Sequence, residues 1–131
     1  MTLRMLDTDI SSYIIKRRPA CLLERFKEHA EELCVSVMTA AELRFGAEKA
    51  GRPRLTEEVE QFLERLSTLD WTDSVTAHYA RTRCALERAG TPIGNMDLLI
   101  ASHALSERAI LVTHNVRHFA KVPGLKVEEW T

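Results

Sequence analysis

Hydrophobic residues gather in short runs that are separated by longer amphipathic stretches. The clearest runs are LRML at 3–6, LCVSV at 33–37 and AILVT at 109–113. Runs with little alternation are typical of strands that are covered on both faces, so we predict three buried strands here. Two weaker strand candidates are STLDW at 67–71 and LKVEEW at 125–130.

Helical patterns fill the gaps between these runs. Residues 54–66 place their apolar side chains on one helical face. Residues 73–89 continue in the same manner up to Gly90, a favourable residue for ending a helix, and residues 95–107 form a third such segment. Strands that alternate with helices predict an α/β fold with a mostly parallel sheet. Sites in such sheets lie outside the carboxyl ends of the strands.

The composition is that of an ordinary globular protein. The chain has 131 residues, 45% of them hydrophobic and 28% charged, which suits a single domain with a real core. A net charge of -1 gives no overall attraction to nucleic acid or to acidic membranes. The three cysteines have no paired spacing, so neither a disulfide framework nor a structural zinc site is indicated. Because no long apolar segment is present, we expect a cytoplasmic protein without membrane association.

Two aspartates follow the first predicted strand. We expect Asp9 to cap a helix that begins at Ile10. One cap needs only one aspartate, so Asp7 is left for another role. Glu42 stands three residues after Thr39, which is the spacing of a capping box.

Further polar residues cluster near the last two predicted elements. Asn95 is placed to cap a helix whose first turn holds Asp97, where a negative charge suits the helix dipole. Thr113 ends the last strong strand, and Asn115 is placed to cap a short helix. His114 and His118 lie within one turn of each other but have no third partner, which makes them weak zinc candidates; no role is assigned to the remaining histidines.

Each of these residues has a structural explanation when it is taken alone, but their joint placement is harder to explain. Asp7, Glu42, Asp97 and Asn115 all fall just past strands or at helix starts. In a parallel sheet these places lie along one edge, so the three carboxylates are expected to converge. Like charges packed together are costly unless a cation neutralises them, and oxygen ligands favour Mg²⁺ or Mn²⁺.

With these motifs, the chain resembles PIN-domain ribonucleases, specifically VapC-type toxins of bacterial toxin–antitoxin pairs. The matching segments are MLDTDI with Asp7, SVMTAAELRFGAEKA with Glu42, GTPIGNMDLLIASHAL with Asp97, and LVTHNVRHFAKVPGLKVEEW near the C-terminus. The resemblance spans essentially the whole chain. It implies one PIN-like domain over residues 1–131, a three-layer α/β/α fold with a central five-stranded sheet.

The sequence departs from the family pattern at two places. Position 9 is commonly Asn, and here it is Asp9. The family segment T-x-[ND]-x-x-[DE]-F runs here from Thr113 to Phe119, and neither Asn115 nor His118 is acidic. We therefore expect one bound ion rather than a complete second metal site.

The resulting hypothesis is metal-dependent hydrolysis of RNA phosphodiester bonds. Asp7 and Asp97 are expected to hold the ion, and Glu42 to complete the acidic cluster and to orient or deprotonate the attacking water. Four residues are expected to position water or a carboxylate: Thr8, Asp9, Thr113 and Asn115.

Basic residues near these motifs could bind the RNA backbone. Lys16, Arg17 and Arg18 end the first expected helix, and Arg44 and Lys49 follow Glu42. Such clusters are at least as often plain solvated surface. The resemblance implies tRNA as substrate, with initiator tRNA as the specific candidate. It also implies a VapB-type antitoxin, a toxin homodimer within a larger complex, and contact with promoter DNA through the antitoxin alone.

Two other classes of protein fit parts of the sequence. A haloacid-dehalogenase-like phosphatase would use Asp7 as nucleophile and Asp9 as acid–base. A receiver-like signalling module, or a related domain without catalysis, would need Asp70 as phosphoacceptor. Neither accounts for both Glu42 and the GTPIGNMD segment.

Overall fold

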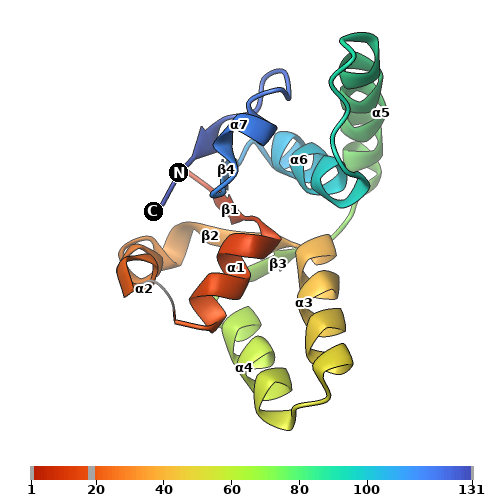
Figure 1. Ribbon diagram of the computed structural model, residues 1–131. Coiled ribbons are helices and arrows are strands. Elements are labelled where there is room, and N and C mark those ends of the chain that lie inside the picture. The colour runs from red at the N-terminus through yellow and green to blue at the C-terminus, as the bar shows by residue number, and fades with distance from the viewer. Residues whose placement is uncertain (1, 18–19, 131) are drawn as a thin grey trace.

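The computed structural model describes residues 2–17 and 20–130. Within them lies a five-stranded sheet in the order β3-β2-β1-β4-β5, and every neighbouring pair of strands is parallel (Figure 1). The strand bounds are β1 Arg4–Leu6, β2 Leu33–Ser36, β3 Ser67–Leu69, β4 Ile110–Val112 and β5 Val127–Glu128. All five predicted strands are thus confirmed, although each is shorter than its hydrophobic run.

Strand β1 occupies the centre of the sheet, between β2 and β4. Leu6 pairs with Val112, and the Asp7 N–H extends this ladder by donating to the Val112 carbonyl at 3.0 Å. The strand order reverses between β1 and β4, which is where open α/β sheets bind ligands. Receiver domains have the order 2-1-3-4-5, so the receiver-like alternative is wrong.

Helices cover both faces of the sheet, which confirms the three-layer prediction (Figure 1). Four helices share one hydrophobic core on the first side of the sheet: α1 Thr8–Ile15, α2 Ala20–Glu28, α3 Val37–Ala50 and α4 Pro53–Glu64. The opposite layer comprises α5 Asp73–Arg88, α6 Asn95–Glu107 and α7 Val116–Phe119, and a 3₁₀ turn at Ala30–Glu32 precedes β2. None of the helices in the described residues is both long and apolar enough to cross a membrane.

Two helix caps differ from the sequence-based expectation. Helix α3 begins at Val37, and Ser36 caps it by accepting the Met38 N–H at 3.1 Å. Thr39 therefore lies inside the helix, fully buried, where its hydroxyl accepts from Thr8 at 3.3 Å. The capping box of Thr39 and Glu42 is wrong, because the chain turns helical as soon as β2 ends.

The cap predicted for α6 is also wrong. Asn95 is the first residue of that helix, and Gly94 holds the cap position without a side-chain hydrogen bond. Asp97 does lie in the first turn, as expected. Because no side chain caps α6, its first backbone N–H groups are left without a partner from the cap residue. The negative charge of Asp97 lies near this positive end of the helix dipole.

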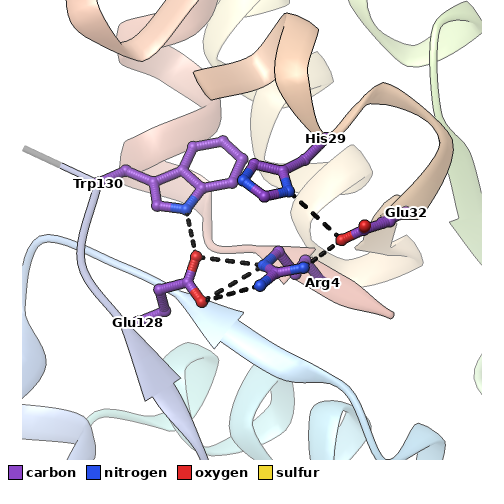
Figure 2. Close-up of polar contacts among 5 residues, drawn as sticks. All are labelled: Arg4, His29, Glu32, Glu128 and Trp130. Carbon is purple, nitrogen blue, oxygen red and sulfur yellow. Dashed lines mark hydrogen bonds and ion pairs between the residues drawn. The ribbon is translucent and has the colours of Figure 1, made fainter. Parts of the chain in front are cut away.

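A polar cluster fastens the last strand to the first one (Figure 2). Arg4 pairs with Glu128 at 3.1 Å and also with Glu32, while the Trp130 indole N–H donates to Glu128 at 2.7 Å. The His29 ring stacks on Trp130, with ring centroids 5.4 Å apart. Trp130 is almost wholly buried in the core beneath α1 and α2. Burying a large apolar side chain contributes roughly 2–3 kcal/mol, so Trp130 helps to hold the segment after β5 against the core.

Candidate active site at the carboxyl edge of the sheet

Asp7 occupies the first position beyond β1 and serves as the N-cap of α1. Its backbone is extended, and its Oδ1 accepts the Ile10 N–H at 2.8 Å. The expectation that Asp9 caps this helix is wrong, because α1 begins at Thr8 and Asp9 lies exposed in its first turn. The helix starts directly after the strand, so the aspartate nearest the strand is the one that caps.

The carboxylate of Asp7 is held in an unfavourable environment. It is 5% exposed, and burial raises its pKa to about 6. The Thr113 hydroxyl and the Ile10 N–H oppose this rise in pKa, whereas the negative charges of Asp9 and Asp97 add to it. The structure therefore brings Asp7 and Asp97 within electrostatic reach of each other, as predicted from strand ends and helix starts.

Thr113 meets Asp7 because of the register of the sheet. Each residue follows the last pair of its ladder, Leu6 with Val112, so the two stand side by side at the carboxyl edge. The buried Thr113 Oγ1 accepts the backbone N–H of Asn115 at 2.9 Å. The hydroxyl proton of Thr113 is thereby left to bond the Asp7 carboxylate, which opposes the rise in the pKa of Asp7. Asn115 occupies the N-cap position of α7, as expected, but its exposed side chain makes no capping bond.

Asp97 has a close neighbour that sequence reasoning did not select. The Nε2 of His118, on α7, lies 3.0 Å from Oδ2 of Asp97. The pair lacks the alignment of a hydrogen bond, and this buried ring nitrogen has no hydrogen-bond partner. The available signal was the position of His118 in the segment where the family pattern places an acid.

Glu42 lies on α3 in an adjoining hollow. That hollow, about 340 Å³ in volume, is also lined by Thr8, Asp9 and Lys16. Asp9 links the two regions, because it lines this hollow and its charge also raises the pKa of Asp7. In the described part of the chain, no three acidic, histidine or cysteine side chains converge tightly enough to form a metal cluster by themselves.

The predicted basic residues occupy different settings. Lys16 and Arg17 line a groove of about 530 Å³ together with Arg52 and Arg54, next to the hollow that holds Glu42. Arg44 pairs with Glu60 through two contacts of 2.8 Å. The exposed Lys49 lies 6.0 Å from the ring centre of Phe45, and Arg18 lies outside the described residues.

A second buried histidine was also missed by sequence reasoning. His103 on α6 meets the Ser36 hydroxyl at 2.7 Å through Nδ1, and the Trp71 ring packs edge-on against it. Burial lowers the pKa of His103, which keeps the ring neutral near pH 7. This contact joins α6 to the end of β2. Nothing in the local pattern distinguishes His103 from the apolar residues around it.

Comparison with known proteins places this geometry in a family. The model of the PIN domain matches residues 4–125. Ribonuclease VapC2 of Haemophilus influenzae is 46% identical over 127 residues, which cover 96% of each chain. The chain belongs to the PIN-domain family and, within it, to the VapC ribonucleases. The VapC relatives include a tRNA(fMet)-specific endonuclease of Salmonella typhimurium, 40% identical over 96% of each chain.

Solved VapC structures share the fold over the full length of the chain. The DNA-bound VapBC of Salmonella typhimurium matches with a TM-score of 0.95 and 39% identity, covering 100% of both chains. VapBC2 of Rickettsia felis, bound to a DNA fragment from its promoter, matches with a TM-score of 0.94 and 35% identity, covering 99% of this chain and 100% of the other. The expected PIN-like, VapC-type fold is thus confirmed.

Proposed function

We propose that this VapC protein is the endoribonuclease toxin of a VapBC-type pair and that it hydrolyses RNA at the carboxyl edge of β1 and β4. The observation that carries this proposal is the buried Asp7, which lies within electrostatic reach of Asp97 at the point where the strand order reverses. Family membership makes the chain a ribonuclease, and the position of these acids supplies a place for the chemistry.

The donor set at this edge fits a divalent cation. Two carboxylates that repel each other, together with a buried ring nitrogen that lacks a partner, are groups that a cation would stabilise. The lack of a tight three-residue cluster among the described residues is compatible with Mg²⁺, which commonly binds one or two carboxylates and keeps several waters. When bound, such an ion activates water and offsets the charge that develops on the phosphate.

The side chains have separable roles in this scheme. Asp7 and Asp97 would hold the ion, and Glu42 would complete the acidic surface and orient or deprotonate the attacking water. Thr113 fixes the Asp7 carboxylate through its hydroxyl. Asn115, Asp9 and Thr8 position water or a neighbouring carboxylate at the rim. No nucleophilic side chain takes part.

The substrate and partners follow by analogy with the relatives. We propose tRNA as substrate, with initiator tRNA as the specific target, because the Salmonella relative is named for tRNA(fMet). The proposed partner is a VapB-type antitoxin, which holds the toxin on promoter DNA, because two VapBC relatives are solved in complex with DNA. We further propose that the toxin is a homodimer within this complex and that the protein acts in the cytoplasm. Lys16, Arg17, Arg44 and Lys49 contribute phosphate contacts that do not read sequence.

An RNA-cleavage assay tests the proposal. Purified antitoxin-free protein is incubated with a tRNA mixture and with initiator tRNA, in Mg²⁺ or Mn²⁺, with and without EDTA. Asp97→Asn is compared with Asp73→Asn, because Asp73 is also in the first turn of a helix but is exposed on α5. We expect discrete cuts that require the metal and Asp97 but not Asp73. Intact RNA with folded wild-type protein in every condition would contradict the nuclease.

A further inference from the structure

We propose that His118 supplies a nitrogen ligand to the metal ion held by Asp97, and that the site therefore prefers Mn²⁺ or another transition-metal ion over Mg²⁺. This inference rests on the proposed function and specifies its metal. It starts from the contact of 3.0 Å between His118 Nε2 and Asp97 Oδ2. Two donors bound at neighbouring corners of one octahedral ion, each about 2.1 Å from it, lie roughly 3 Å apart.

The state of the ring nitrogen favours a shared cation over a simple hydrogen bond. His118 Nε2 is buried and has no hydrogen-bond partner in the described part of the chain, although a carboxylate oxygen lies at hydrogen-bonding distance. If this nitrogen carries a proton, the proton is poorly aligned with Asp97. If it carries a lone pair, that lone pair and the oxygen repel each other. A cation that faces both atoms removes either penalty, because imidazole and carboxylate are both metal ligands.

The imidazole is held in place by the fold. Helix α7 is anchored by Phe119, which is 1% exposed, and the His118 ring packs edge-on against the Phe119 ring at 5.3 Å. The backbone N–H of His118 donates to the Asn115 carbonyl at 3.2 Å, and this bond fixes the backbone of α7. A ligand on an anchored element loses little conformational freedom when the ion binds.

The nitrogen donor predicts which ion is selected. Carboxylate and water ligands suit both Mg²⁺ and Mn²⁺, whereas an imidazole ligand suits transition-metal ions. Of these two ions only Mn²⁺ is a transition metal, so a nitrogen donor favours it over Mg²⁺. A site that pairs Asp97 with His118 therefore binds Mn²⁺ more tightly, relative to Mg²⁺, than a site with an acid at position 118. Replacing His118 by Asp should restore the preference for Mg²⁺.

Pulsed EPR of the Mn²⁺-loaded full chain tests this directly, without an activity readout. We expect a ¹⁴N hyperfine coupling that His118→Gln abolishes and that His114→Gln retains. His114 is the matched control, because it lies in the same segment but its ring packs against Tyr13 at 5.0 Å. Calorimetry should show that His118→Gln weakens Mn²⁺ binding roughly tenfold or more. A loss of this size is typical even when a residue that only supports a metal ligand is replaced. His118→Asp should lower the Mn²⁺ to Mg²⁺ affinity ratio.

Two results would overturn the inference, and they differ in what they mean for the function. Mn²⁺ binding that needs Asp97 but shows no ¹⁴N coupling and no change in His118→Gln would remove His118 from the site and leave the proposed function intact. No Mn²⁺ or Mg²⁺ binding at millimolar concentration by folded wild-type protein would remove both. Circular dichroism of each variant establishes that it is folded.

Discussion

Asp7 both caps a helix and carries a charge that the fold does not favour. Its carboxylate is buried beside Asp97 and Asp9, and its pKa is raised to about 6. A raised pKa in the folded state means that the folded protein binds the proton more tightly than the unfolded chain. The contribution to stability is therefore complete below about pH 4 and is lost as the pH rises through 6.

We predict that Asp7→Asn abolishes cleavage and stabilises the metal-free protein at pH 8. Asn caps a helix about as well as Asp, so α1 keeps its start while the buried charge is removed. The gain should be of order 2 kcal/mol at pH 8 and should vanish near pH 3.5. Urea unfolding in EDTA at both pH values measures it. Equal stability of the two proteins at pH 8 would contradict the prediction.

Arg108 offers a test of backbone strain that is independent of the site. It ends α6 in the left-handed conformation, with φ of 55°, where glycine is favoured. We predict that Arg108→Gly stabilises the protein by about 1 kcal/mol, because an L side chain is disfavoured there. Ala89→Gly is the matched control, since Ala89 is the C-cap of α5 in the right-handed conformation, where glycine should cost up to about 1 kcal/mol. Thermal unfolding of both variants gives the comparison.

At the scale of elements, the hydrophobic pattern predicted the strands and the helices α4, α5 and α6 well. It failed at boundaries, because a single side chain decides where each helix begins. Ser36, rather than Thr39, caps α3, and Asp7, rather than Asp9, caps α1. Candidate caps stand two or three residues apart, and only the point where the strand ends chooses between them. Helix α2 was missed because it is short, with 9 residues, and only Leu22 and Phe26 of its side chains are buried.

The cluster around Arg4 should make the β1–β5 connection sensitive to acid. Burial opposes ionisation of Glu128, but hydrogen bonds from Arg4 and Trp130 outweigh it and lower the pKa of Glu128. A lowered pKa stabilises the folded protein above the ordinary pKa of glutamate, and this stabilisation is lost as the pH falls.

We predict that Glu128→Gln destabilises the protein by about 1 kcal/mol at pH 7 and much less below pH 4, because it weakens the charged bonds of Arg4. Glu129→Gln, at the exposed neighbouring position, is the control and should change little. Chemical denaturation across this pH range provides the measurement. A loss that is the same at both ends of the range would point to packing rather than to the charge of Glu128.

At the scale of the whole molecule, the sequence predicted that Asp7, Glu42 and Asp97 converge, but among the described residues the three do not form one tight cluster. Asp7 and Asp97 lie within electrostatic reach, whereas Glu42 lines the adjoining hollow with Asp9. Strand ends fix the edge on which a residue lies, so this much could be inferred. The contact of His118 with Asp97 depends on how α7 packs against α6, which no local pattern records.

The groove of Lys16 and Arg52 adjoins that hollow, and its charge should govern RNA affinity. We predict that Lys16→Gln with Arg52→Gln weakens RNA binding and lowers the slope of log affinity against log salt by about 2, roughly 1 for each phosphate contact. Cleavage at saturating RNA should be retained. Arg81→Gln, exposed on α5, is the control. Filter binding over a salt series measures the slope, and an unchanged slope would exclude this groove as the RNA path.

The pairing of β1 with β4 also determines when the toxin can become active. Asp7 and its partner Thr113 lie far apart in the sequence, as do Leu6 and Val112, which form the ladder pair beside them. Contacts so distant in sequence form only after the intervening residues exist. A chain that lacks β4 therefore cannot assemble the edge on which Asp7 and Thr113 meet. Catalysis at this edge therefore waits until Thr113 has joined Asp7 in the folded sheet, so a chain cut between β1 and β4 is expected to be inactive.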